Sequence, residues 1–142
     1  MSSEKFKIFT DINKDIVDIR TKVFIEEQNV PKDLEIDNNE YDYIHCCLYV
    51  SEKLVAYLRY NINEHNAAHI GRVCVEKSYR KKNYGSKIML FAENEIRNQN
   101  GKIIELGAQV HAKVFYSKLG YSEYGEEFFD AGILHIHMKK DL

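Results

Sequence analysis

The segment SYRKKNYGSK, residues 78 to 87, holds four cations and one glycine, and its residue types suggest ligand binding. It follows an apolar run that ends at Val75 and precedes an amphipathic run that begins near Tyr84, so it predicts a turn from a strand into a helix. The first backbone N–H groups of a helix lack intrahelical partners and can bind phosphate. Gly85 would let a ligand approach closely, and Asn83 tolerates a left-handed backbone. From spacing alone, a phosphate site and an exposed basic turn are equally supported.

Other phosphate and nucleic-acid sites are not indicated. The sequence contains neither GxxxxGK[ST] nor GxGxxG, the loops of P-loop and dinucleotide-binding proteins. A nucleic-acid surface would need basic and aromatic residues along one face, whereas acids resume at Glu93 and Glu95. The 20 Lys and Arg residues against 22 Asp and Glu residues give a net charge of −2, which provides no overall attraction to nucleic acid or to an anionic membrane. The turn is therefore suited to one small phosphate ligand.

The composition is that of a globular protein. A chain of 142 residues with 44% hydrophobic residues can bury one core, so residues 1–142 are expected to form a single domain. No stretch approaches the roughly 18 uninterrupted apolar residues of a membrane span, and MSSEKFKIF lacks the apolar core of a signal peptide, which favours the cytoplasm. Cys46, Cys47 and Cys74 form no CxxC pair and are expected to be reduced core residues.

Hydrophobic periodicity gives the element order β-α-β-β-β-α-β-α-β-β. Alternating apolar residues predict strands at residues 5–9, 43–50, 54–62, 67–75, 103–106, 121–124 and 133–139. Apolar stripes predict helices at residues 12–28, 84–100 and 112–119, the first of them capped by Thr10 or Asp11. Residues 32–42 are expected to form an acidic loop with about one helical turn. This order is typical of a mixed α/β (α+β) layer rather than of a doubly wound nucleotide fold.

Two motifs give the sequence a family resemblance. VEKSYRKKNYGSKIM resembles the Q/R-x-x-G-x-G/A acyl-coenzyme A signature of the Gcn5-related N-acetyltransferases (the GNAT family), with Asn83 in place of the first glycine. AKVFYSKLGY, residues 112–121, is similar to the second cofactor motif of that family, A-x-x-F-Y-x-K-x-G-F. RTKVFIEEQNVP, IELGAQVHAKVFY and DAGILHIHM resemble the ElaA-like subgroup, which tends to have proline where Leu134 stands. The resemblance implies the GNAT fold, a mixed, mostly antiparallel sheet with helices on both faces, splayed between its fourth and fifth strands.

The same resemblance implies a cofactor, acetyl-coenzyme A (acetyl-CoA), with coenzyme A as the product. Backbone groups of the fourth strand would place the thioester, and the basic turn would hold the diphosphate. Gln109 stands where many relatives have an asparagine that binds the cofactor arm. The implied cofactor-binding residues are Val73, Cys74, Val75, Arg80, Lys81, Lys82, Asn83, Tyr84, Gly85, Ser86, Gln109 and Tyr116.

Acetyl transfer to an amine needs a proton donor for the leaving thiolate and a base for the amine. Tyr116 matches the tyrosine of the family motif and would be the general acid; the alternative is a core tyrosine on the last helix. The candidates for the base are Glu26, Glu27, His45, His111 and His135, of which Glu27 and His111 are the predicted catalytic residues. Contact with the acceptor is predicted for Glu27, Gln28, His45 and His135. The alternatives are a solvated helix end for Glu27 and Gln28 and a helix cap for His111.

Two other groups of side chains leave alternatives open. His135 and His137 share one strand face and could chelate a metal, but a third ligand at recognisable spacing is missing, so no metal is expected. The acidic loop could attract a cationic acceptor or could be an ordinary solvated loop.

The sequence therefore predicts an acetyl-CoA-dependent N-acetyltransferase that acts on a primary amine of a small molecule or a peptide. The alternative is a catalytically silent module that keeps the acyl-CoA pocket and serves as a sensor or a partner subunit. A third hypothesis is a metal-dependent enzyme built on the two histidines. Neither nucleic acid nor a membrane is an expected partner, and exposed edge strands would allow a homodimer.

Overall fold

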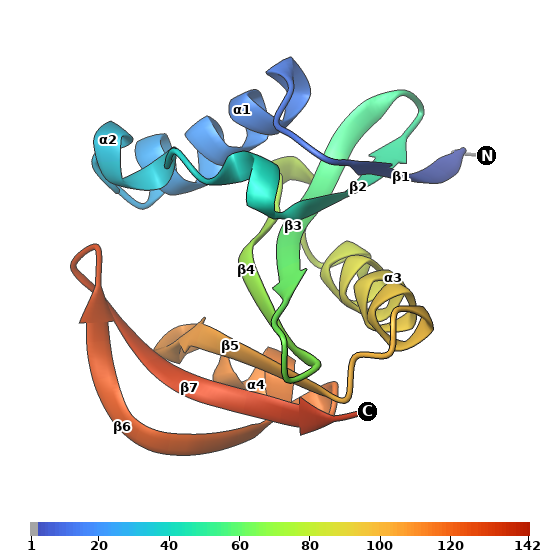
Figure 1. The fold of residues 1–142 in the computed structure, drawn as a ribbon. Helices are drawn as coiled ribbons and strands as arrows, with labels where there is room; N and C mark the ends of the chain where they lie inside the picture. Colours follow the sequence, from blue (N-terminus) through green and yellow to red (C-terminus); the bar gives the residue numbers. More distant parts are fainter. Residues whose placement is uncertain (1–2) are drawn as a thin grey trace.

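The computed structural model describes residues 3–142 and contains a seven-stranded sheet in the order β1-β2-β3-β4-β5-β7-β6 (Figure 1). The strands are β1 Glu4–Phe9, β2 Ile44–Val50, β3 Lys53–Ile62, β4 Ala67–Val75, β5 Ile103–Gln109, β6 Ser122–Asp130 and β7 Ile133–Asp141. All neighbouring strands are antiparallel except β4 and β5, which are parallel. The predicted mixed, mostly antiparallel sheet is confirmed.

The described residues form four α-helices, which are α1 Lys14–Arg20, α2 Lys32–Glu35, α3 Tyr84–Asn98 and α4 Lys113–Lys118. The π-helix η1, Thr21–Glu27, continues α1, so the single first helix of the prediction is α-helical and then π-helical. Asn13 caps α1 by accepting the backbone N–H of Ile16 at 3.0 Å, and the expected cap at Thr10 or Asp11 is wrong. None of the helices within residues 3–142 is long and apolar enough to cross a membrane.

Helices cover both faces of the strands β2 to β4, as predicted. Successive strand residues point to opposite faces, so the neighbours Cys46 and Cys47 enter two different apolar clusters. Cys46 packs in the cluster that contains Ile88 of α3, whereas Cys47 packs in the cluster that contains Ile16 of α1. Figure 1 shows α1 and α3 on opposite sides of these strands. Burial raises the pKa of the Cys47 thiol to about 12, so it remains a neutral core group.

The sheet splits between β4 and β5. These strands pair only over Ala67–His69 and Ile103–Glu105 and then separate. A register shift against β3 follows in β4, where Arg72 has a left-handed φ of 56°. Such a bulge bends a strand and increases its twist. The predicted splay between the fourth and fifth strands is confirmed.

The last hairpin is longer than the sequence predicts. The prediction ends the first of its strands at residue 124, whereas β6 continues to Asp130. The pairing of β6 with β7 shifts register between Tyr124 and Phe128, which interrupts the period-two pattern on which the prediction depends. Phe128 and Asp130 thereby belong to a strand that reaches the gap beside β4.

Candidate active site

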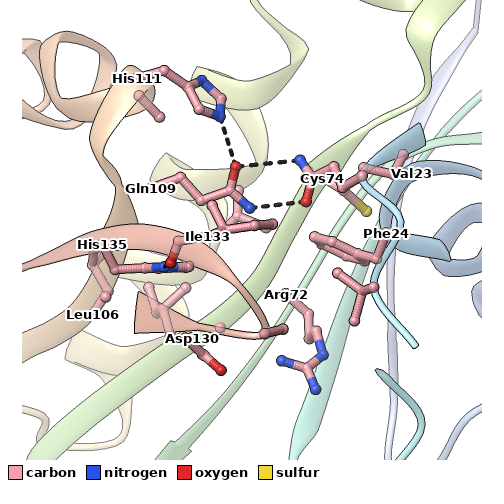
Figure 2. A pocket seen from close by; sticks show the side chains of 18 of the residues that line it. Val23, Phe24, Arg72, Cys74, Leu106, Gln109, His111, Asp130, Ile133 and His135 are labelled. Atoms are coloured by element: carbon pink, nitrogen blue, oxygen red, sulfur yellow. Dashed lines mark hydrogen bonds between the residues drawn. The ribbon is translucent and has the colours of Figure 1, made fainter. Parts of the chain in front are cut away.

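A cleft of about 950 Å³ occupies the gap between β4 and β5. Val23 and Phe24 of η1 line one wall, and Ile133 and His135 of β7 line the opposite wall (Figure 2). Cys74 of β4 also lines the cleft and lies beside Val23 and Phe24. Segments from both ends of the chain therefore face each other across the splay.

The structure brings most of the predicted site residues together at this cleft. Those that line it are Glu27, Gln28, Val73, Cys74, Val75, Arg80, Gly85, Gln109, His111, Tyr116 and His135. The other residues of the basic turn, which do not line the cleft but adjoin Arg80 and Gly85 in the chain, are Lys81, Lys82, Asn83, Tyr84 and Ser86. His45 lies elsewhere.

The basic turn has the backbone that an anion cradle requires. Asn83 is left-handed, with φ 67° and ψ 15°, and α3 starts at the next residue. Asparagine therefore supplies the conformation for which glycine is usual, and which few other residues adopt. The side chain of Asn83 does not cap α3, so the backbone N–H groups of the first helical turn remain available to a ligand.

Gly85 is held at this helix start by close packing. A Cβ atom at this position would lie 3.2 Å and 3.3 Å from two ring atoms of Phe115 and 3.6 Å from a methyl carbon of Val75. A larger side chain would have to displace the Phe115 ring of α4 or move the start of α3. The glycine thus brings the two predicted cofactor motifs into contact.

Tyr116 lies in the cleft wall with only 7% of its surface exposed. Its ring packs edge-on against Phe115 and Tyr121, with centroids 4.9 Å and 6.0 Å away. Within residues 3–142 its hydroxyl has no hydrogen-bond partner, although the neighbouring Tyr121 hydroxyl donates to Glu93 at 2.8 Å. Burial raises the pKa of Tyr116 above its ordinary value. The phenol therefore stays protonated and has a proton to donate into the cleft.

Glu27 is engaged by the basic turn. Both terminal nitrogens of Arg80 donate to its carboxylate, each at 2.6 Å. The Nε–H of Arg80 also donates to the carbonyl of Val75 at 3.0 Å. The hydrogen bonds from Arg80 lower the pKa of Glu27 below its ordinary value. A carboxylate held in this way is a poor proton acceptor, which argues against the predicted role of Glu27 as the base.

A chain of amide contacts crosses the cleft beside this ion pair. Gln109 donates to Gln28 at 2.9 Å, and Gln28 donates back at 3.3 Å (Figure 2). The Nε2 atom of His111 lies 2.6 Å from the same Gln109 oxygen, and since that oxygen can only accept, the imidazole donates. His111 therefore orients Gln109, which argues against its predicted role as the base through Nε2.

Three acids of the segment 32–42 bind buried arginines. Arg20 is fully buried and donates to Glu35 and Glu40, each at 2.8 Å. Arg59 donates to Glu40 at 2.8 Å and to Asp37 at 2.9 Å. These contacts fold the acidic segment against the sheet. These three carboxylates are paired with arginines, so they contribute little to the hypothesis that the acidic loop attracts a cationic acceptor.

The prediction that His45 contacts the acceptor is wrong. The imidazole is fully buried, and its two nitrogens lie 2.5 Å from the Tyr57 hydroxyl and 2.7 Å from the carbonyl oxygen of Glu40. Burial lowers its pKa, so it is neutral and joins the acidic segment to β3. The alternating pattern predicts that β2 is a strand, but it does not show that this strand lies away from the cleft, with none of its residues in the cleft lining.

The pair His135 and His137 forms part of an aromatic stack. Phe128 lies between the two imidazoles, with centroids 5.5 Å and 4.3 Å away, and Tyr124 stacks on His137 at 5.4 Å. His135 also uses its Nδ1 atom to contact the carbonyl of Ile133 at 2.7 Å. Among the described residues, no group of three or more His, Cys, Asp or Glu residues is arranged to hold a metal ion. The stack packs the two histidines of β7 against aromatic side chains of β6.

His69 is a cleft residue that the sequence reasoning missed. It ends the paired part of β4, where the splay begins, and it lines the cleft. Its side chain is exposed to solvent in the cleft, but the walls displace part of the water around its ring and Arg59 is nearby, so its pKa is lowered below the ordinary value. The sequence places His69 in the predicted strand 67–75. It lines the cleft only because β5 separates from β4 after this residue, which the sequence pattern does not show.

The splayed sheet, the uncapped start of α3 and the buried phenol fit the GNAT class of acetyltransferases. The chain matches the family model of the acetyltransferase (GNAT) domain over residues 8–142. It therefore belongs to the GNAT acetyltransferase family, as its two motifs predicted.

Named relatives extend this result. The uncharacterized N-acetyltransferase YjcF of Bacillus subtilis is 39% identical over 129 residues, which cover 90% of this chain and 91% of YjcF. The protein ElaA of Escherichia coli is 30% identical over 131 residues, covering 89% and 86% of the two chains. The crystal structure of E. coli ElaA superposes with a TM-score of 0.81, at 26% identity over 99% of both chains. An acyl-CoA N-acyltransferase from Pseudomonas aeruginosa gives a TM-score of 0.82 at the same identity and coverage.

Proposed function

We propose that this protein transfers the acetyl group of acetyl-CoA directly to a primary amine of a small molecule or a peptide. The observation that carries the proposal is the protonated phenol of Tyr116, which has no hydrogen-bond partner within residues 3–142 and lies in the wall of a cleft that borders an uncapped helix start. Family membership supports an acyl transfer, and the name of the P. aeruginosa structure supports acyl-CoA as the donor.

The residues around the cleft fit this cofactor. The backbone N–H groups at the start of α3 would bind the diphosphate. The β4 backbone near Cys74 would contact the pantetheine arm, because none of the described strands pairs with that edge of β4 after the splay. When bound, acetyl-CoA supplies an acetyl group activated as a thioester. Tyr116 would give its proton to the departing sulfur, and water in the cleft could return one to the phenol.

His69 is the proposed base for the acceptor amine. Its lowered pKa keeps the imidazole neutral at neutral pH, so its ring can take a proton, directly or through one water. His135 uses its Nδ1 atom within its own strand, and its predicted acceptor contact would come from its ring face or Nε2. Glu27 is hydrogen-bonded to Arg80, and His111 is hydrogen-bonded to Gln109, so neither is proposed as the base.

The pH profile tests His69. The base works when neutral, so kcat/KM should fall about tenfold per pH unit on the acid side of a midpoint that lies below the ordinary imidazole value of about 6.5. In His69→Gln this acid limb should disappear, because the titrating group is gone. An unchanged limb in the variant would assign the titration to another residue.

Gly85→Leu should weaken coenzyme A binding by about tenfold or more, since the new side chain must displace Phe115 or the start of α3. Lys81→Gln and Lys82→Gln remove only exposed charges, and each should weaken binding by about two- to threefold. Isothermal titration with coenzyme A measures all three dissociation constants. If the lysine variants were the weaker binders, the turn would be a charge patch instead of a backbone cradle.

The activity itself is tested with acetyl-CoA and a broad panel of primary amines, with detection of the released thiol. Amine-dependent thiol release is expected. Tight coenzyme A binding with no release for any amine would favour the alternative, a silent sensor or partner module.

The proposal includes a cytoplasmic setting, which the three unpaired buried cysteines support, and a homodimer formed through an edge strand such as β1.

A further inference from the structure

Two adjacent residues at the end of η1 are tied to opposite sides of the splay. Glu27 binds Arg80, which follows β4, through two hydrogen bonds of 2.6 Å. Gln28 exchanges two amide hydrogen bonds with Gln109 at the end of β5. We call these two contacts the η1 ties. They connect the wall assigned to the acceptor with both strands assigned to the cofactor.

The η1 ties occupy two side chains, Arg80 and Gln109, that the family resemblance implies for binding acetyl-CoA. Arg80 gives both terminal nitrogens to Glu27 and its Nε–H to the carbonyl of Val75. Gln109 uses both its oxygen and its nitrogen on Gln28. A phosphate oxygen would compete with Glu27 for Arg80, because both are anionic acceptors. An amide of the pantetheine arm would compete with Gln28 for Gln109 in the same way.

The ties are suited to exchange. The side chains of Arg80 and Glu27 are 36% and 33% exposed, so water screens the ion pair and its net contribution is small. The segment that carries Glu27 is a seven-residue π-helix, a rare form that is common at functional sites. Asn29, just after it, has a left-handed φ of 59°. This helix end is thus held by side chains that a ligand can replace.

We propose that Glu27 and Gln28 are positioning residues, which hold the acceptor wall in place and give way when the cofactor binds. The inference rests on the proposed function, since it takes coenzyme A as the competing ligand. Cofactor entry would then move the acceptor wall, so that the two sites are coupled. Two opposite effects follow when a tie is cut: the cofactor binds more tightly, because a competitor is gone, and the acceptor binds less well, because its wall is loose.

The test compares Glu27→Gln with Glu26→Gln. Both variants remove one negative charge from the same helix end, but Glu26 is exposed and forms no ion pair within residues 3–142. Glu27→Gln should lower the coenzyme A dissociation constant about two- to fivefold, as expected for loss of one screened ion pair, and Glu26→Gln should leave it within about 1.5-fold. The acceptor KM should rise in Glu27→Gln while kcat stays near the wild-type value.

A double-mutant cycle tests whether the tighter coenzyme A binding of Glu27→Gln depends on Arg80. In an Arg80→Gln background, Glu27→Gln should no longer tighten coenzyme A binding, since the competition is for Arg80. Gln28→Leu cuts the other tie and should also raise the acceptor KM. A merely destabilised protein would not bind its cofactor more tightly.

Three outcomes would overturn the inference. One is a coenzyme A affinity in Glu27→Gln that equals that of Glu26→Gln or falls below wild type, even though the wild type binds; the proposed function would then stand. Another is a large loss of kcat in Glu27→Gln with unchanged affinity, which would make Glu27 the base. Absence of coenzyme A binding to the wild type would overturn both the inference and the proposed function.

Discussion

Tyr116→Phe is expected to lower kcat by roughly 100- to 10,000-fold, the range for loss of a positioned general acid, while the coenzyme A dissociation constant changes by no more than about twofold. The hydroxyl of Tyr116 has no partner among residues 3–142, and burial keeps it protonated, so its removal leaves the packing of the ring intact. Steady-state kinetics and coenzyme A titration give the two quantities.

Tyr124→Phe is the matched control, because it removes the same group from a ring that does not line the cleft. Its kcat should stay near the wild-type value. Turnover by Tyr116→Phe at the wild-type rate would show that the thiolate is protonated by water or by another group. Tyr116 would then be a packing residue of α4.

Arg20→Met should destabilise the fold by roughly 3 to 5 kcal/mol, because it removes the fully buried cation that joins Glu35 and Glu40 and leaves these buried acids only their contacts with Arg72 and Arg59. For a chain of 142 residues this corresponds to a fall in Tm of roughly 10 to 20 °C. Lys22→Met is the control: it removes an exposed cation that has no ion pair within residues 3–142 and should shift Tm by about 2 °C at most. Thermal and urea unfolding measure both variants.

The buried ion pairs also give stability a definite dependence on pH. Burial alone would raise the pKa of Glu40, but its hydrogen bonds with Arg20 hold it below the ordinary value. Its contribution is therefore full above the unfolded-state pKa of about 4.5 and is lost as pH falls through the lower value of the folded state. Wild type should lose stability below about pH 4.5 more steeply than Arg20→Met. Parallel acid profiles would show that Arg20 is not the stabilising partner.

Periodicity predicted most of the architecture because it reports local burial. The order of strands and helices follows from patterns within short stretches, and Asn83 was expected to tolerate a left-handed backbone. The splay was implied by the family resemblance. The end of β6 was missed because a register shift near Tyr124 breaks the alternation. The change of the first helix from α to π form leaves the apolar stripe unchanged, so the sequence pattern did not predict the π-helix.

The sequence predicted which residues line the candidate site better than it predicted what each residue does there. Motif resemblance predicted that Tyr116 and Arg80 contact the same cofactor, and both line one cleft. The contact of Glu27 with Arg80 joins residues 53 positions apart, and that of Gln28 with Gln109 joins residues 81 positions apart. Such contacts depend on how the sheet brings distant elements together, so they cannot be predicted from local sequence patterns. For the same reason the sequence could not show that His45 faces the core.

The short pairing between β4 and β5 has a consequence for how sites of this kind diversify. Because main-chain hydrogen bonds join the two strands over only three residues of β4, Ala67–His69, backbone geometry fixes the vertex of the gap but leaves its far end to whichever side chains span it. In this protein those are the end of η1 and the end of β5. Substitutions at these few positions could widen the gap, narrow it or change its charge without altering the pairing of any strand. A lineage can thus change its acceptor while its scaffold stays the same.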